Sequence, residues 1–369
     1  MRSTVCSIAI ASSMCLPSSR SRSVVVVMAL AFRSVPGPNV PFPPMEAELV
    51  SELPTGGDWQ YEPKWDGFRG VLENDGGELA LWSRKERPLL RYFPELRPLG
   101  DLLPPHSALD GEIVIARNGV LDFDSMQMRL HPAESRVRKL SAEIPADFIA
   151  FDVLLWDGEP IHRLPLDERR DFLERIGKGF HLSPATRDPD VAREWLETFE
   201  VAGLDGVIAK RLGVPYHPGE RDAVTKVKPF KTADCVVVGV RWKAKPSHLA
   251  TLLLGLYNDE GEIGYVGSAA VGAKRHDEIL ARVQPLLKDA PERRFSEPNR
   301  WGGGELEQSP LRPELVAEVR YDKVQGNRFR HGSRLLRFRE DKDPRDCTWL
   351  EVRPPRRPND PTFESLLAG

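Results

Sequence analysis

Residues 64–69 read Lys-Trp-Asp-Gly-Phe-Arg, which places Lys64 two residues before an Asp-Gly turn. Lysine amines are protonated at neutral pH, and they become nucleophiles toward phosphorus when burial or nearby cations lower their pKa. A surface lysine in a turn is the ordinary alternative. A covalent nucleotide adduct on Lys64 is therefore favoured once other segments supply the cations and acids that such chemistry needs.

Lys226 and Lys228 alternate within the short sequence Thr-Lys-Val-Lys at residues 225–228. Side chains two residues apart on a β-strand share a face, so both ammonium groups can act on one ligand. We expect them to hold phosphate oxygens and to raise the positive potential around Lys64. A solvated strand edge is the alternative.

In two segments an acid and a glycine lead into an apolar strand. Residues 109–114 contain Glu112, and residues 205–210 begin with Asp205. A carboxylate at such a junction has little water around it and needs a partner, either a ribose hydroxyl or a metal ion. Two such acids suit a hard divalent cation beside phosphates, so they are candidate ligands for Mg²⁺, with Mn²⁺ as an alternative. Each acid alone is also an ordinary turn residue. Phe151, inside an apolar run, is either a core residue or a stacking surface for a base.

Composition indicates two globular domains, since the chain has 369 residues, of which 40% are hydrophobic and 29% charged. The four cysteines form no CxxC pair, so neither a zinc ribbon nor a disulfide framework is indicated, and a reducing, cytoplasmic setting fits. The net charge is −3, but residues 210–245 hold nine Lys/Arg against three acids. This segregation allows a basic, nucleic-acid-binding face, with a mixed solvated surface as the alternative.

The first 44 residues differ from the rest, because they hold no acidic residue, a Ser/Arg stretch, an apolar run at residues 24–32 and a cluster of prolines. The apolar run is too short to span a membrane. We favour an upstream translation start, with the true start at Met28 or Met45, over a targeting segment. In either case we expect this extension to be disordered.

Short apolar runs alternate with charged turns up to about residue 231 and predict an α+β domain with mainly antiparallel strands. The predicted elements there are strands at 78–83, 108–116, 148–156 and 206–210 and helices at 166–176 and 188–202. Further on, β-rich runs at 235–242, 251–257, 263–271 and 315–324 surround a helix at 276–287. This second pattern predicts an all-β barrel of the OB-fold type, with a sandwich as the alternative.

Taken in order, these segments resemble the nucleotidyltransferase motifs shared by ATP-dependent DNA ligases and mRNA-capping enzymes. Motifs I, Ia, III, IIIa, IV, V and VI are matched at residues 64–69, 83–96, 109–112, 151–154, 205–210, 226–228 and 339–342. The resemblance covers roughly residues 46–350 and is nearest to the small bacterial C-type ligases. It implies an ATP-grasp-like adenylation domain at 45–232 and an OB-fold domain at 233–355, preceded by the extension at 1–44 and followed by a tail at 356–369.

The resemblance implies that Lys64 takes AMP from ATP and passes it to the 5′-phosphate of nicked duplex DNA, whose 3′-hydroxyl then displaces the AMP. Such a reaction serves DNA repair or replication, and we expect a monomer without a membrane segment. The implied contacts are Glu62 with adenine, Phe151 with the base, Arg69 and Glu112 with the ribose, Arg221 with the nucleotide, Arg84 with the 5′-phosphate, Lys226 and Lys228 with the α-phosphate, and Arg339, Asp341 and Lys342 with pyrophosphate. Asp205 stands where this superfamily commonly has Glu, which shortens the reach to a metal ion.

Two rival interpretations remain. An RNA ligase or a capping-type guanylyltransferase shares the motif set, and labelling with ATP or GTP separates it from a DNA ligase. A non-catalytic OB-fold protein would bind single strands through aromatic side chains such as Trp242, Tyr257 and Tyr265. That second rival leaves the Lys64 segment and both acid-and-glycine turns unexplained.

Overall fold

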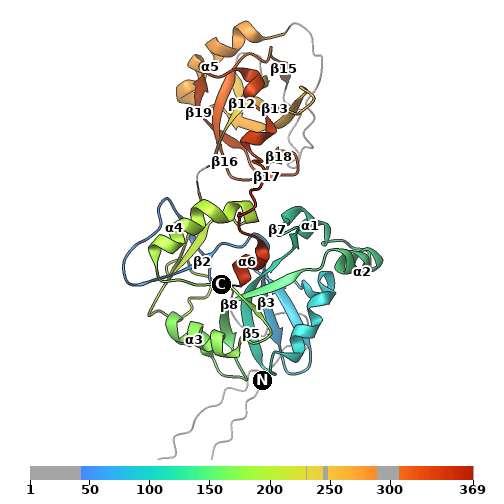
Figure 1. The fold of residues 1–369 in the computed structure, drawn as a ribbon, viewed down its shortest axis with the longest axis vertical. Coiled ribbons are helices and arrows are strands. Elements are labelled where there is room, and N and C mark those ends of the chain that lie inside the picture. Colours follow the sequence, from blue (N-terminus) through green and yellow to red (C-terminus); the bar gives the residue numbers. More distant parts are fainter. Residues whose placement is uncertain (1–42, 230, 244–247, 289–306, 369) are drawn as a thin grey trace, which may run out of the picture.

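The computed structural model describes residues 43–229, 231–243, 248–288 and 307–368. The predicted extension at residues 1–44 therefore lies almost wholly outside the described residues. Figure 1 shows two bodies stacked along the long axis, an α+β body that holds the early strands and a barrel built from later ones. Among the described helices, none is long and apolar enough to cross a membrane.

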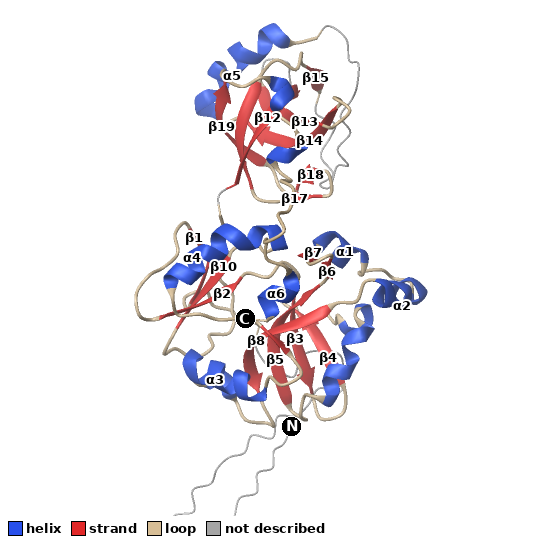
Figure 2. Ribbon diagram, in the orientation of Figure 1, coloured by secondary structure: helices blue, strands red, loops and turns tan. Residues whose placement is uncertain are grey.

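The α+β body is built on two sheets, visible as separate groups of strands in Figure 2. Its pairings are antiparallel except those of β1 with β11 and of β8 with β9. One sheet has the order β4 (Leu79–Ser83), β3 (Phe68–Asn74), β5 (Ser107–Val114), β8 (Asp147–Leu155) and β9 (His181–Leu182). The other has the order β1 (Glu48–Val50), β11 (Val224–Val227), β10 (Val207–Arg211) and β2 (Trp59–Pro63).

Apolar side chains join the two sheets at one end. Val71, Trp82 and Leu154 of the first sheet pack with Val224 of the second in one buried cluster. The sheets carry helices and a small hairpin, which are α1 (Phe123–Met128), α2 (Glu134–Glu143), α3 (Leu166–Ile176), α4 (Pro189–Thr198), and β6 (Ala116–Arg117) with β7 (Val120–Leu121). The strands that carry the predicted motifs thus belong to both sheets, which pack against each other.

The second body is a closed barrel, because β12 pairs with both β13 and β16, and β14 and β19 complete the ring. A closed sheet leaves no unpaired strand edge except at short added strands, and OB-folds close their sheets in this way. The predicted α+β domain followed by an OB-fold is confirmed. The elements of the barrel are β12 (Lys231–Trp242), β13 (Leu249–Tyr257), β14 (Ile263–Ala270), α5 (His276–Val283), β15 (Gln308–Pro310), β16 (Val316–Tyr321), β17 (Val324–Gln325), β18 (Arg328–Phe329) and β19 (Ser333–Arg339).

The chain does not end in the barrel. The sequence suggested only a tail at residues 356–369. Its described residues, 356–368, return to the α+β body and form α6 (Phe363–Leu367) there, as Figure 1 shows in red. Phe363 and Leu366 are buried in a cluster with Trp65 and Leu204. The last helix therefore belongs to the core of the first body.

Candidate active site

A cavity of roughly 850 Å³ opens between the two sheets of the α+β body. Its walls come mainly from the strands that carry the predicted motifs and from the loops that follow them, and Asp322, Arg330 and His331 of the second body also line it. All ten nucleotide and metal residues predicted outside the barrel line it, namely Glu62, Lys64, Arg69, Arg84, Glu112, Phe151, Asp205, Arg221, Lys226 and Lys228. The structure thus brings together side chains separated by up to 166 positions in the sequence, the spacing between Glu62 and Lys228.

Lys64 lies in a turn that is fixed by its own backbone. Its amide donates to the carbonyl of Gly206 at 2.9 Å, and the amide of Asp205 donates to the Lys64 carbonyl at 3.0 Å. Gly206 has a φ of +130°, and a Cβ there would meet the carbonyl oxygen of Val227 at 2.0 Å. Only glycine tolerates both conditions, so the acid-and-glycine segment is a structural requirement for docking the lysine turn.

The amine of Lys64 lies against a carboxylate that also binds a second lysine. Lys64 Nζ lies 2.9 Å from Asp205 Oδ2, and Lys228 Nζ lies 2.8 Å from the same oxygen. Burial alone would raise the pKa of Asp205, but the two ammonium groups outweigh it and lower the pKa to about 2. Asp205 is therefore ionised throughout the physiological range and balances the clustered positive charge. Lys226 lies on β11, Lys228 directly follows the end of that strand, and Lys226 Nζ donates to the carbonyl of Ala47 at 3.0 Å.

Glu62 is held by Lys210, a residue for which no role was predicted. Lys210 Nζ lies 2.7 Å from Glu62 Oε1 and donates to the carbonyl of Phe151 at 2.9 Å. The same ammonium lies 4.8 Å from the centre of the Phe151 ring. Lys210 thus ties the side chain predicted to meet adenine to the residue predicted to stack on it.

Arg69 is oriented by a buried network that sequence reasoning also missed. It donates to both carboxylate oxygens of Asp110, at 2.9 Å for the Nε bond, to the Met45 carbonyl at 2.6 Å and to Tyr216 Oη at 3.2 Å. Tyr216 Oη itself donates to Asp110 Oδ2 at 2.7 Å. A signal for Asp110 existed, because it precedes Glu112 by two positions and so shares its strand face.

Arg84 and Arg221 lie at the rim, joined through Glu46. Arg221 Nε donates to Glu46 Oε2 at 2.8 Å, and Arg84 Nε lies 4.0 Å from Glu46 Oε1. Both guanidinium groups are exposed. They are placed to meet a ligand that enters from solvent.

Glu112 faces the lysine turn and is poorly solvated. Its Oε1 accepts a hydrogen bond from the amide of Gly67 at 3.1 Å. Burial raises the pKa of Glu112 to about 7, against the lowering effects of Lys64 and Arg69. The carboxyl is therefore divided between its two protonation states near neutral pH.

This raised pKa predicts a pH-dependent stability. Between its ordinary pKa near 4.5 and about 7, the folded protein binds a proton at Glu112 that the unfolded chain has lost. The unfolding free energy should fall over that window by up to about 3 kcal/mol, and the Glu112→Gln variant should lack this component. Urea unfolding at pH 5 and pH 8 measures it, with the exposed Glu159→Gln as the matched control. An identical fall in wild type and Glu112→Gln would contradict the assignment.

The predicted pyrophosphate residues lie elsewhere. Arg339 Nη1 and Lys342 Nζ each lie 3.0 Å from Asp234 Oδ2, and Arg339 Nε donates to Asp341 Oδ1 at 2.8 Å. These contacts lie within the barrel, and the three residues are not among the described residues that line the 850 Å³ cavity. The structure does not bring motif VI to the site, so its role stays a prediction.

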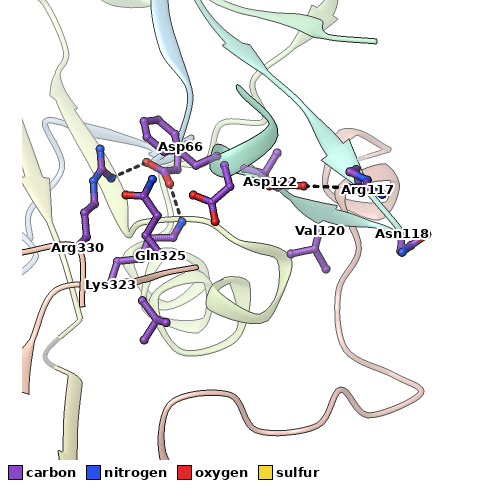
Figure 3. Close-up of a pocket in the computed structure, with 12 residues that line it drawn as sticks. Asp66, Arg117, Asn118, Val120, Asp122, Lys323, Gln325 and Arg330 are labelled. Atoms are coloured by element: carbon purple, nitrogen blue, oxygen red, sulfur yellow. Dashed lines mark hydrogen bonds and ion pairs between the residues drawn. The ribbon is translucent and has the colours of Figure 1, made fainter. Parts of the chain in front are cut away.

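The barrel instead presents its β17–β18 region to the lysine turn. Lys323 Nζ lies 2.6 Å from Asp66 Oδ2, and Arg330 Nη1 lies 3.4 Å from Asp66 Oδ1. Figure 3 shows these two basic side chains reaching the carboxylate at one side of a smaller cavity, of about 440 Å³. Lys228 makes a further link, because its Nζ lies 3.1 Å from Asp322 Oδ1. Five charged side chains thus link the barrel to the α+β body through three ion pairs.

Comparison with known proteins assigns the family. A protein-family model described as "ATP dependent DNA ligase domain" matches residues 44–228, and one described as "ATP dependent DNA ligase C terminal region" matches residues 245–342. DNA ligase C2 of Mycolicibacterium smegmatis is 43% identical over 341 residues, covering 85% of this chain and 95% of that protein. The chain belongs to the ATP-dependent DNA ligases.

Two further similarities agree with this assignment. DNA ligase C of Mycobacterium tuberculosis is 41% identical to this ligase over 343 residues, covering 85% of this chain and 94% of that protein. A solved structure named "Pmar-Lig_Pre." has a TM-score of 0.52 at 16% identity, covering 81% of this chain and 69% of that chain, and it supports the fold alone. The ligase uses ATP and acts on DNA, as the sequence predicted.

Proposed function

We propose that this ligase seals nicks in duplex DNA through a lysyl-AMP intermediate on Lys64. The observation that carries the proposal is the position of the Lys64 amine in the large cavity, flanked by Asp205 and by the cations Lys226 and Lys228. In the first step Lys64 Nζ bonds to the α-phosphorus of ATP, while the bond from that phosphorus to the pyrophosphate oxygen breaks. The amine must first be deprotonated and leave its ion pair with Asp205.

The residues around Lys64 supply position and charge. Lys226 and Lys228 are proposed to hold the α-phosphate oxygens, which places the phosphorus on the line of attack and stabilises the charge that develops there. Arg69, fixed by Asp110, and Phe151, fixed by Lys210, are proposed to hold the adenosine. Most of the catalytic effect then comes from groups that are already oriented before ATP binds.

Glu112 and Asp205 are proposed to hold a divalent cation. Their donor atoms fit, because both are carboxylates lining one cavity with the phosphate-binding lysines, and hard oxygen ligands suit Mg²⁺ or Mn²⁺. The cation, when bound, neutralises phosphate charge.

The later steps use the same cavity. The 5′-phosphate of the nick attacks the phosphorus of lysyl-AMP, and the bond to Lys64 Nζ breaks. The 3′-hydroxyl then attacks the 5′-phosphate, and AMP leaves as the phosphodiester forms. Arg84 at the rim is proposed to hold that 5′-phosphate. We further propose that the protein works as a monomer in the cytoplasm, in DNA repair or replication, and that Arg339, Asp341 and Lys342 orient pyrophosphate after the barrel turns.

Labelling tests the proposal directly. Incubation with Mg²⁺ and ATP labelled at the α-phosphate should give a labelled protein, and ATP labelled at the γ-phosphate should give none. Added pyrophosphate should remove the label, and a nicked DNA duplex should be sealed as the label leaves. Label from GTP alone, or sealing of RNA nicks alone, would favour the capping enzyme or RNA ligase instead.

A further inference from the structure

The segment after the barrel touches both bodies before it ends. Arg353 donates to the Gly326 carbonyl in the β17–β18 turn, and Arg356 Nη1 donates to the Asn118 carbonyl in the β6–β7 turn at 3.2 Å. The amide of Phe363 then donates to the carbonyl of Gly119 at 2.8 Å. The chain is therefore led along the interface to a defined position on the α+β body.

Helix α6 has a capped start despite its short length. Thr362 Oγ1 accepts from the amide of Ser365 at 3.2 Å, and the Thr362 amide donates to Ser365 Oγ at 2.9 Å. This reciprocal capping box fixes the first turn. An isolated helix of this length is not stable in water, so tertiary packing through the buried Phe363 and Leu366 must hold it.

The packing partners are the residues next to the active-site groups. Trp65, which follows Lys64, is 5% exposed, and its ring meets that of Phe363 edge-on at 6.1 Å between centroids. Leu204, which precedes Asp205, is 3% exposed and belongs to the same buried cluster. Helix α6 thus packs against both turns on the side that faces away from the Lys64–Asp205 ion pair.

We propose that α6 is a positioning element for the nucleophile, with Phe363 holding Trp65 and thereby Lys64. The inference rests on the proposed role of Lys64 in adenylation. Trp65 is anchored on one side by the bond from its Nε1 to Ser183 Oγ, at 3.0 Å, and on the other by Phe363. Loss of the second support lets the indole shift, and the adjoining Lys64 amine moves with it. Helix α6 lies beyond both family matches, which end at residues 228 and 342.

Positioning predicts an effect on rate without an effect on ATP binding. The adenosine contacts proposed for Arg69 and Phe151 depend on Asp110 and Lys210, and in the described part of the chain neither of these two forms a hydrogen bond or ion pair with α6. In single-turnover adenylation, Phe363→Ala should lower the rate at saturating ATP by about tenfold or more, because small misplacements of reacting groups are costly. The ATP concentration that gives half the maximal rate should stay within about twofold of wild type.

The controls separate positioning from folding. Assays are run where circular dichroism shows every variant fully folded. Phe363→Leu should restore most of the rate, and Glu364→Ala, on the exposed face of α6, should match wild type. If Phe363→Ala does not fold, Leu366→Ala replaces it in the same comparison. A wild-type rate in the folded variant overturns the role of α6, whereas an unlabelled wild-type protein overturns the proposed function itself.

Discussion

Replacing Lys64 with alanine is expected to abolish covalent labelling by ATP and the sealing of ordinary nicks. The side-chain amine is the atom to which AMP is joined, and neither Lys226 nor Lys228 can replace it, because Lys226 is held by Ala47 and Lys228 by Asp205 and Asp322. The variant should fold normally. Asp205 keeps its contact with Lys228, so the unfolding free energy should change by only about 1 kcal/mol.

Two comparisons make this prediction specific to nucleophilic chemistry. Lys64→Arg retains a cation near Asp205 but offers a poor nucleophile, so it should also remain unlabelled. A nicked duplex that already carries AMP on its 5′-phosphate bypasses the lysine, and Lys64→Ala should still seal it. Gel detection of labelled protein and of sealed strands measures both. Labelling of Lys64→Ala at the wild-type rate would place the adduct on another residue.

The residues that line the site could be predicted from the sequence because side chains that bind a ligand must have the chemistry which that ligand requires. Lys64, Asp205, Lys226 and Lys228 have side chains that phosphate chemistry requires, so their types and order were informative. The supporting residues were harder to find. Asp110, Lys210 and Tyr216 act on other side chains across the sheets, and their roles depend on strand pairings that the sequence does not specify. Only Asp110 carried a local signal, its spacing of two from Glu112.

The secondary-structure elements also differed in how well the sequence predicted them. Helix α3 was predicted with its observed bounds, at residues 166–176, because its apolar spacing is long and regular. Helix α6 was missed because five residues give too little periodicity and prolines precede them. The orientation of the barrel depends on contacts such as that of Lys323 with Asp66, which join residues 257 positions apart. The sequence therefore predicted motif VI without showing that it lies away from the cavity.

Loss of Asp152 is expected to have the largest effect on stability. This carboxylate lies on β8 beside Phe151 and is 3% exposed. It accepts from Arg169 Nε at 2.8 Å and from Arg169 Nη2 at 3.0 Å, while Arg169 Nη1 donates to the carbonyls of Leu164 and Val214. The pair thereby joins β8, α3 and the loop that leads to Tyr216.

Asp152→Ala leaves the Arg169 guanidinium buried without its counter-charge, which should lower the unfolding free energy by about 3–5 kcal/mol. A double variant, Asp152→Leu with Arg169→Met, should recover much of this loss, since a buried ion pair is often replaceable by apolar packing.

Burial raises the pKa of Asp152, but Arg169 outweighs it and the net pKa is lowered. Its stabilising contribution is therefore present above the unfolded pKa of about 3.9 and is lost as the pH falls through the lower folded value. Urea unfolding at pH 7 and pH 3 measures both effects, and a loss below about 1 kcal/mol in Asp152→Ala at pH 7 would show that the pair contributes little.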